Sequence, residues 1–242
     1  MKILLATQGS QGVVALRELF AGNFRPDGIH VAVCGNGANG PLLEFINYNK
    51  IKLSEHNSGP EFTKWLINVE QEYDVLLSIS WSYLFSEQVI KHFSGRAINF
   101  HPGILPNYRG CFSIPWSIIN QEKYVGFTYH YISEKIDEGD IIFQEKIKIG
   151  DFDTAHSLNH KVFQLGLSKL VKVIGLIGNE GKPQPSGGQY YPNSLPFNGK
   201  FDKKWSSKKT KTFMRAMFYP PHETSLNDLD ELTEEQADNG IE

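Results

Sequence analysis

The chain has 242 residues and a net charge of −3, and 40% of its residues are hydrophobic against 21% charged. This balance excludes a disordered or collagen-like chain, and the length allows one large domain with an appendage or two small domains. Two cysteines are too few for a disulfide framework and no signal-peptide pattern follows Met1, so we expect a cytoplasmic protein. No apolar run approaches the roughly 20 residues of a membrane span, so we expect no membrane contact.

The charge is distributed unevenly along the chain. Residues 222–242 contain eight acidic and no basic residues, which is typical of a solvated tail. Residues 1–221 then carry 24 basic and 19 acidic residues, a net charge of +5. Much of this excess lies in residues 199–215, where seven Lys and Arg residues accompany one Asp. The segment is either a solvated helix face or an anion-binding surface.

Strand and helix patterns alternate through the first hundred residues. We expect, in chain order, a strand at 2–6, a turn at 7–12, a helix at 13–20, a strand at 28–34, a helix at 62–73, a strand at 74–80, a helix at 87–93 with Ser86 as its N-cap, and a strand at 95–100. This order predicts an α/β fold with a mostly parallel sheet covered on both faces. Ligands should bind at the carboxyl ends of the strands.

The pattern changes after Gly110. We expect a helix at 114–120, strands at 125–132 and 141–147, and one long helix at 154–178 capped by Asp153 or Thr154. Residues 182–199 are rich in Pro and Gly, which predicts a linker or an irregular hairpin. We therefore divide the chain into a main domain at 1–181 and an extension at 182–242, which comprises a hairpin, a basic and aromatic segment and an acidic tail.

The turn at residues 7–12, TQGSQG, is a candidate phosphate loop because a Gly-rich strand-to-helix turn presents backbone N–H groups to an anion. It matches neither the G-x-G-x-x-G pattern nor a Walker loop, since its only glycines are Gly9 and Gly12 and no Lys follows. A plain tight turn is therefore the simpler interpretation.

The segment at 98–110, INFHPGILPNYRG, carries candidate chemistry. Asn99 and His101 fall on the same face of an extended backbone. An Asn amide can donate to an oxyanion, and a His can transfer a proton near neutral pH. Pro102 and Pro106 restrict the loop that follows.

A carboxylate in the KIDEGD loop, between the two later strands, is the third candidate. Asp137 is placed to orient or charge the histidine, and Glu138 and Asp140 are alternatives for that role. A structural histidine remains the competing interpretation, because these groups do not by themselves name a reaction. The sequence indicates no metal site.

The segment NFHPGILPNYRG, with Asp137 lying 36 residues after His101, resembles the formyltransferase family that uses 10-formyltetrahydrofolate. The resemblance covers roughly residues 1–180 and implies a Rossmann-like formyltransferase fold with 10-formyltetrahydrofolate as co-substrate. It assigns the catalytic roles to Asn99, His101 and Asp137. It implies that Asn99 and a protonated His101 stabilise the oxyanion formed when an amine attacks the formyl carbon, while Asp137 stabilises the imidazolium.

The resemblance also implies where the folate binds. One loop lies before the helix that precedes the Asn99 strand, and a second loop closes over the pteridine. The residues concerned are Ser82, Tyr83, Leu84, Phe85, Ser133 and Lys135.

The acceptor distinguishes the members of this family. A methionyl-tRNA enzyme would carry a further basic barrel domain, whereas this chain ends in acidic residues, so we expect no nucleic-acid partner. Glycinamide ribonucleotide enzymes read H-P-S where this chain has His101-Pro102-Gly103, and they lack the Tyr108-Arg109-Gly110 ending. A formyltetrahydrofolate hydrolase carries an additional regulatory domain.

The nucleotide-sugar branch has a motif resembling W-S…R-A-x-x-x-P-P, which this chain matches with Trp205-Ser206 and with Arg215-Ala216 through Pro220-Pro221. We therefore expect the acceptor to be a nucleotide sugar, namely dTDP-4-amino-4,6-dideoxyglucose destined for O-antigen lipopolysaccharide or another surface polysaccharide. The expected substrate contacts are Ser10, Gln11, Gly12, Gly103, Tyr108, Arg109, Arg215 and Tyr219.

Three alternatives stay open at this stage. A purine-pathway enzyme that formylates glycinamide ribonucleotide is the nearest rival, and an inactive folate-binding relative is another. For the aromatic residues of the basic segment, the alternative to stacking on the nucleotide is a simple packing role. Separately, we expect a homodimer contact at three aromatic residues of the Pro-rich region, namely Tyr190, Tyr191 and Phe197.

Overall fold

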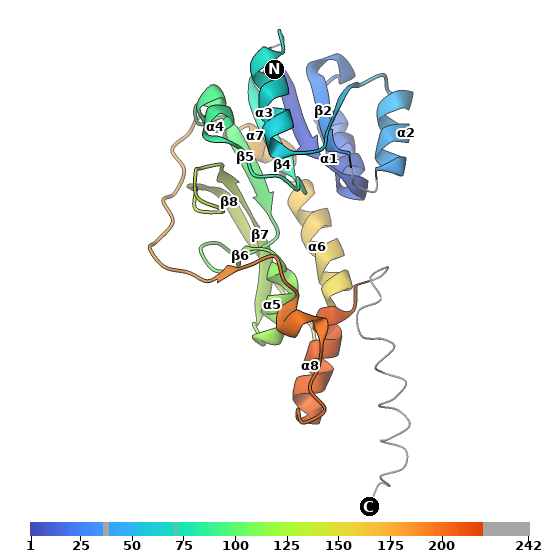
Figure 1. Ribbon diagram of the computed structural model, residues 1–242, viewed down its shortest axis with the longest axis vertical. Coiled ribbons are helices and arrows are strands. Elements are labelled where there is room, and N and C mark those ends of the chain that lie inside the picture. Colours follow the sequence, from blue (N-terminus) through green and yellow to red (C-terminus); the bar gives the residue numbers. More distant parts are fainter. Residues whose placement is uncertain (36–38, 71, 220–242) are drawn as a thin grey trace, which may run out of the picture.

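The computed structural model describes residues 1–35, 39–70 and 72–219. A seven-stranded sheet with the order β3-β2-β1-β4-β5-β7-β8 forms its centre (Figure 1). The strands are β1 Ile3–Thr7, β2 Ile29–Cys34, β3 Lys52–His56, β4 Val75–Ile79, β5 Ala97–His101, β7 Tyr124–Tyr131 and β8 Ile141–Lys148. The first five strands pair in parallel, and β7 and β8 complete the sheet in antiparallel pairing. The predicted mostly parallel α/β fold is confirmed.

Helices cover both faces of the sheet. They are α1 Gly9–Ala21, α2 Gly40–Tyr48, α3 Gly59–Asn68, α4 Glu87–Phe93, α5 Ser113–Ile119, α6 Ala155–Leu167, α7 Leu170–Ile174 and α8 Ser207–Met217, with 3-10 turns at Pro26–Gly28 and Pro196–Gly199. Successive strand residues point to opposite faces. Ile3 and Leu5 accordingly belong to one buried core, and Leu4 and Ala6 belong to the other. The central strands are apolar throughout because both of their faces are buried.

The predicted turn at 7–12 is largely the first turn of α1. The helix begins at Gly9, whose backbone N–H donates to the Asn39 side-chain oxygen at 2.9 Å. Gly12 lies so close to the sheet that an added Cβ would be 2.8 Å from both Thr7 and Leu42. The structure also contains α2 and β3, which the sequence patterns did not predict.

The long helix predicted at 154–178 is divided into α6 and α7. Thr154 is its N-cap, with Ser157 completing a capping box, so the predicted start is confirmed. Near the end of α6 the Gly166 carbonyl accepts the Tyr129 hydroxyl at 2.9 Å, and the Lys169 N–H also bonds to that carbonyl at 3.0 Å. A turn tightened to the i−3 spacing interrupts the regular helix ladder.

The extension returns across the main domain (Figure 1). Lys182 bridges to Ile141 on β8, and β9 Tyr190–Tyr191 then pairs in parallel with the two-residue strand β6 Arg109–Gly110. Helix α8 packs beside α5 and α6 and buries Phe213 in the larger core. Trp205 lies against Phe213, with ring centroids 5.4 Å apart, so both rings have the packing role that was the alternative to nucleotide stacking.

Among the described residues, no helix is long and apolar enough to cross a membrane. The acidic residues at 222–242 and the Pro220-Pro221 pair lie outside the described residues.

Candidate active site

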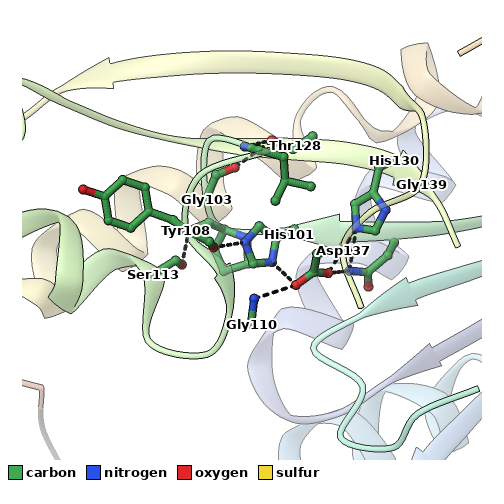
Figure 2. A network of polar contacts seen from close by, with 12 residues as sticks. His101, Gly103, Tyr108, Gly110, Ser113, Thr128, His130, Asp137 and Gly139 are labelled. Atoms are coloured by element: carbon green, nitrogen blue, oxygen red, sulfur yellow. Dashed lines mark hydrogen bonds and ion pairs between the residues drawn. The ribbon is translucent and has the colours of Figure 1, made fainter. Parts of the chain in front are cut away.

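The three predicted catalytic residues meet at the end of β5, and Figure 2 shows His101 and Asp137 facing each other there. Asn99 and His101 extend from β5, and Asp137 comes from the loop between β7 and β8. The His101 Nδ1 lies 3.4 Å from the Asp137 Oδ2, and the Asn99 amide nitrogen donates to Asp137 Oδ1 at 3.4 Å. His101 is buried, with 3% of its surface exposed. The expected convergence of an amide, an imidazole and a carboxylate is therefore present.

Of the three candidate carboxylates in the β7–β8 loop, Asp137, Glu138 and Asp140, only Asp137 faces the histidine. Asp137 adopts a left-handed backbone conformation with φ of 55°, which directs its side chain inward. Glu138 instead pairs with Arg109 and Lys135, and Asp140 is exposed. The alternatives left open by the sequence are thus resolved geometrically in favour of Asp137.

The loop after His101 holds the imidazole from its other side. The Nε2 of His101 lies 2.7 Å from the Tyr108 carbonyl, so this ring nitrogen carries the proton and donates it to that carbonyl. Gly103 lies directly against the ring, and a Cβ at this position would be 2.6 Å from Nε2. Its carbonyl accepts the Thr128 hydroxyl at 2.7 Å (Figure 2).

His130 is a fourth member of the site that sequence reasoning missed. It lies on β7 directly opposite Asn99 in the antiparallel register. Its Nε2 lies 3.3 Å from Asp137 Oδ1 and 3.2 Å from the Asn99 amide nitrogen, and its Nδ1 lies 2.8 Å from the Tyr131 carbonyl. A histidine within a buried, otherwise apolar strand was visible in the sequence. Its position beside Asn99 depended on a strand pairing that the sequence did not reveal.

The electrostatics of the site follow from burial and close contact. Burial opposes ionisation of Asp137, but His101, His130 and the Gly110 N–H outweigh it and hold the pKa of this carboxyl well below its usual range. Burial also lowers the pKa of the His101 imidazole, although the Asp137 carboxylate opposes this shift. Burial and the ionised carboxylate thus act in opposite directions on the proton of His101 Nδ1, which faces Asp137 Oδ2.

A cavity of about 610 Å³ opens onto Asn99, His101 and Asp137. All of the predicted folate contacts line it: Ser82, Tyr83, Leu84, Phe85, Ser133 and Lys135. Trp81 lines it as well and stacks on Phe85, with centroids 6.1 Å apart and planes 9° apart. The indole N–H of Trp81 is buried without a hydrogen-bond partner among the described residues.

A second, largely apolar cavity of about 430 Å³ shares one lining residue with the first, Pro102, which follows His101. Phe112, Ser113, Asn159 and Tyr219 are among the residues of its wall, so one predicted substrate contact lies here. The three predicted catalytic residues line the first cavity, and Pro102 beside His101 borders both cavities.

The other predicted substrate contacts make intramolecular interactions or lie elsewhere. The Tyr108 hydroxyl donates to Glu122 at 2.7 Å, and Arg109 pairs with Glu138. Arg215 donates to the carbonyls of Asp153 and Gly150, which attaches α8 to the loop before α6. Three further residues form the first turn of α1 and are not among the described residues that line the two cavities: Ser10, Gln11 and Gly12.

Residues 39–174 match the family described as formyl transferase. The chain belongs to this family. It is 35% identical over 180 residues to the GDP-perosamine N-formyltransferase of Brucella melitensis, an alignment that covers 70% of each chain. The enzyme is therefore a formyltransferase, and formyl transfer is the reaction against which the site geometry is interpreted.

Two solved structures share the fold over most of the formyltransferase chain. The N-formyltransferase from Helicobacter canadensis, in complex with folinic acid and dTDP-3-aminofucose, superposes with a TM-score of 0.76 at 24% identity, covering 90% of this chain and 81% of that chain. The sugar 3N-formyltransferase WlaRD, with dTDP and 5-N-formyl-THF, superposes with a TM-score of 0.74 at 25% identity and covers 90% and 80%.

Proposed function

We propose that this enzyme transfers a formyl group from 10-formyltetrahydrofolate to the primary amine of a nucleotide-linked amino sugar. The observation that carries the proposal is that Asn99, His101 and Asp137 lie together in the wall of one cavity, and that Pro102, which follows His101, also borders a second cavity. One cavity suits a folate and the other suits an acceptor, so the two substrates approach the same groups from different sides. The relatives named above act on amino sugars or were crystallised with them, which supports this choice of acceptor.

The first cavity fits a pteridine. It offers the aromatic faces of Trp81 and Phe85 together with the unpartnered Trp81 N–H, a combination that suits a flat ring with polar edges. When bound, 10-formyltetrahydrofolate supplies the electrophilic formyl carbon. Lys135 lies at this cavity with its ammonium group exposed, where it can pair with a carboxylate of the folate tail.

Asn99 stabilises the negative charge that develops on the formyl oxygen. Its amide nitrogen carries two protons, and Asp137 Oδ1 and His130 already orient the group. A preorganised donor of this kind lowers the barrier by about 2.7–4 kcal/mol.

His101 and Asp137 move the proton. The Nε2 proton of His101 is committed to the Tyr108 carbonyl, so Nδ1 and Asp137 Oδ2 form the basic position. This pair accepts the proton that the acceptor amine releases as its new nitrogen–carbon bond forms. The pair then returns that proton to the folate nitrogen as the formyl carbon–nitrogen bond breaks, so the enzyme ends in its starting state.

The second cavity suits the nucleoside of the acceptor. Its walls are mostly apolar, Phe112 and Tyr219 supply aromatic rings, and Asn159 supplies an amide for the edge of a base. Of the predicted nucleotide contacts, Tyr219 is the one that lines this cavity, so the proposal keeps it. Gly103 borders the reacting groups. Ser10, Gln11 and Gly12 stay predictions for the diphosphate, and so does Arg215 for the nucleotide.

Within this class we propose dTDP-4-amino-4,6-dideoxyglucose as the acceptor, with its product used for O-antigen or another surface polysaccharide. The relatives named above act on or were crystallised with both GDP-linked and dTDP-linked compounds, so the nucleotide is the feature to test. The homodimer and the cytoplasmic location stay predictions of the sequence.

The experiment is incubation of the purified enzyme with 10-formyltetrahydrofolate and a panel of dTDP-, UDP- and GDP-linked 3-amino and 4-amino sugars, with mass spectrometry of the products. Formylation of the dTDP-linked 4-amino sugar is the expected result. If only a GDP-linked sugar is formylated, the proposed acceptor nucleotide changes from dTDP to GDP. Formylation of glycinamide ribonucleotide alone would favour the purine-pathway activity.

A further inference from the structure

A strap of the extension, residues 182–193, runs beside the catalytic loop and contacts its backbone. The strand β9 within it pairs with β6: the Arg109 N–H donates to the Gln189 carbonyl at 2.9 Å, and the Cys111 N–H donates to the Tyr191 carbonyl at 2.9 Å. The strap thus lies along one edge of a short strand in the main domain.

The opposite edge of β6 faces the catalytic pair. Tyr108, just before β6, and Gly110, at its end, both adopt positive φ, of 59° and 85°, and each directs a backbone polar group away from the strap. The Tyr108 carbonyl accordingly accepts from His101 at 2.7 Å, and the Gly110 N–H donates to Asp137 at 2.8 Å. One strand therefore separates the strap from both members of the pair, and β9 fixes where that strand lies.

Side chains reinforce this contact. The Tyr191 ring stacks on Tyr108, with centroids 5.5 Å apart and planes 10° apart, and on Trp116 at 4.8 Å. The Tyr191 hydroxyl accepts from the Asn120 amide at 2.8 Å. The strap is anchored to α5 and its following loop as well as to β6.

A second contact reaches the Asp137 loop directly. The side-chain nitrogen of Gln184 donates to the Asp137 carbonyl at 2.8 Å and to the Gly139 carbonyl at 2.7 Å. Both protons of this amide are thereby used. They hold a loop in which Asp137 adopts a positive φ and Gly139 lies so close to Tyr131 that an added Cβ would be 1.8 Å from its carbonyl. A non-glycine residue at positive φ persists only when its surroundings hold it there.

We propose that Gln184 is a positioning residue for catalysis and that the strap is a structural part of the active site. Gln184 holds the backbone of Asp137 from the side of the strap, while β6 holds the carboxylate of Asp137 from the side of the main domain. The assignment of a catalytic consequence rests on the proposed function, because it requires Asp137 to act in formyl transfer.

The test replaces Gln184 by Met, which keeps the length of the side chain and removes both hydrogen bonds. Gln189→Met is the matched control, because Gln189 lies in the same strap and, within the described part of the chain, its exposed side chain bonds only to the carbonyl of the adjacent Tyr190. We expect Gln184→Met to lower kcat roughly tenfold to a hundredfold, the range that follows from a small displacement of a reacting group. The KM values for both substrates should change less than twofold, and Gln189→Met should match the wild type.

A second readout does not depend on the reaction. The groups that face the Asp137 carboxylate are the Asn99 amide, His101, His130, the Gly110 N–H and the Cys111 thiol. If the Asp137 carboxylate is displaced, His101 loses the contact that favours its protonated form. The His101 titration in Gln184→Met should therefore move to lower pH. NMR of ¹⁵N-labelled histidine measures this titration. A role confined to overall stability would lower the melting temperature without this change.

The outcomes separate the two proposals. If the wild type formylates no acceptor in the panel, the proposed function fails, while the histidine titration still tests the strap. An active wild type together with a folded Gln184→Met of unchanged kcat and unchanged titration overturns the strap proposal alone. An equal loss in Gln189→Met also overturns it. If Gln184→Met does not fold, Gln184→Asn, which retains the amide but shortens its reach, takes its place with the same expected losses.

Discussion

The His101 imidazole and the Asp137 carboxylate face each other at 3.4 Å, and each is held by a backbone group at one end of the short strand β6. The Tyr108 carbonyl fixes Nε2 of the histidine, and the Gly110 N–H fixes Oδ2 of the aspartate. The Nδ1 and Oδ2 atoms are therefore directed at one another, where a single proton can be shared.

Removal of the oxyanion donor should reduce turnover without unfolding the protein. Asn99 is half-buried in the wall of a cavity, so Asn99→Ala removes little packing. We expect kcat to fall about a hundredfold or more, as for other oxyanion-hole donors. Steady-state kinetics measures the loss, and an unchanged melting temperature is the control. A variant with normal kcat would remove Asn99 from the mechanism.

A methyl group at Gly103 should disturb the histidine. The added Cβ would lie 2.6 Å from His101 Nε2 and 3.1 Å from the Tyr108 carbonyl, so Gly103→Ala must displace the hydrogen bond between them. We expect a loss of kcat of about a hundredfold. Gly40→Ala is the matched control, because a Cβ at Gly40 meets no atom of the described residues within 4 Å. Equal activity in the two variants would contradict the geometry.

The two cavities predict separable effects on KM. Trp81 lines the proposed folate cavity with an unpartnered N–H, whereas Tyr219 lines the proposed acceptor cavity. Trp81→Phe should raise KM for 10-formyltetrahydrofolate alone, by about fivefold to tenfold for one lost hydrogen bond. Tyr219→Ala should raise KM for the nucleotide sugar alone. The reverse pattern would exchange the assignments of the cavities.

A buried histidine far from the catalytic residues should make stability depend on pH. Burial, with the charges of Lys52 and His56 adding to it, lowers the pKa of His30 to about 4. Between about pH 6.5 and pH 4 the unfolded chain binds a proton at His30 that the folded chain does not, so stability falls as the pH falls through this window. Urea unfolding at pH 7 and pH 5 measures the loss. His30→Phe should lose less stability over this interval than the wild type, and an identical loss would contradict the assignment.

Most strands, and the shared face of Asn99 and His101, were predictable because their determinants are local. Buried parallel strands are apolar throughout, and Asn99 and His101 share a face through a period of two. The polar strand β3 forms an edge of the sheet, where half-exposed residues give no apolar run. The break after α6 depends on the distant Tyr129 hydroxyl.

The functional residues that the sequence did not reveal depend on pairing between distant segments. His130 reaches the site through the register of β5 with β7, and Gln184 reaches it from the extension. No local pattern encodes either contact. Tyr108 and Arg109 stood within a recognisable motif, but their side chains bond to Glu122 and Glu138.

The most direct test of the account is formyl transfer by the wild type and by His101→Ala, assayed with 10-formyltetrahydrofolate and the panel of nucleotide-linked amino sugars. We predict a formyl mass increment on an amino sugar with the wild type, and a rate about a hundredfold lower with a folded His101→Ala. Near-normal turnover in His101→Ala, or transfer by the wild type to none of these amines, would contradict it.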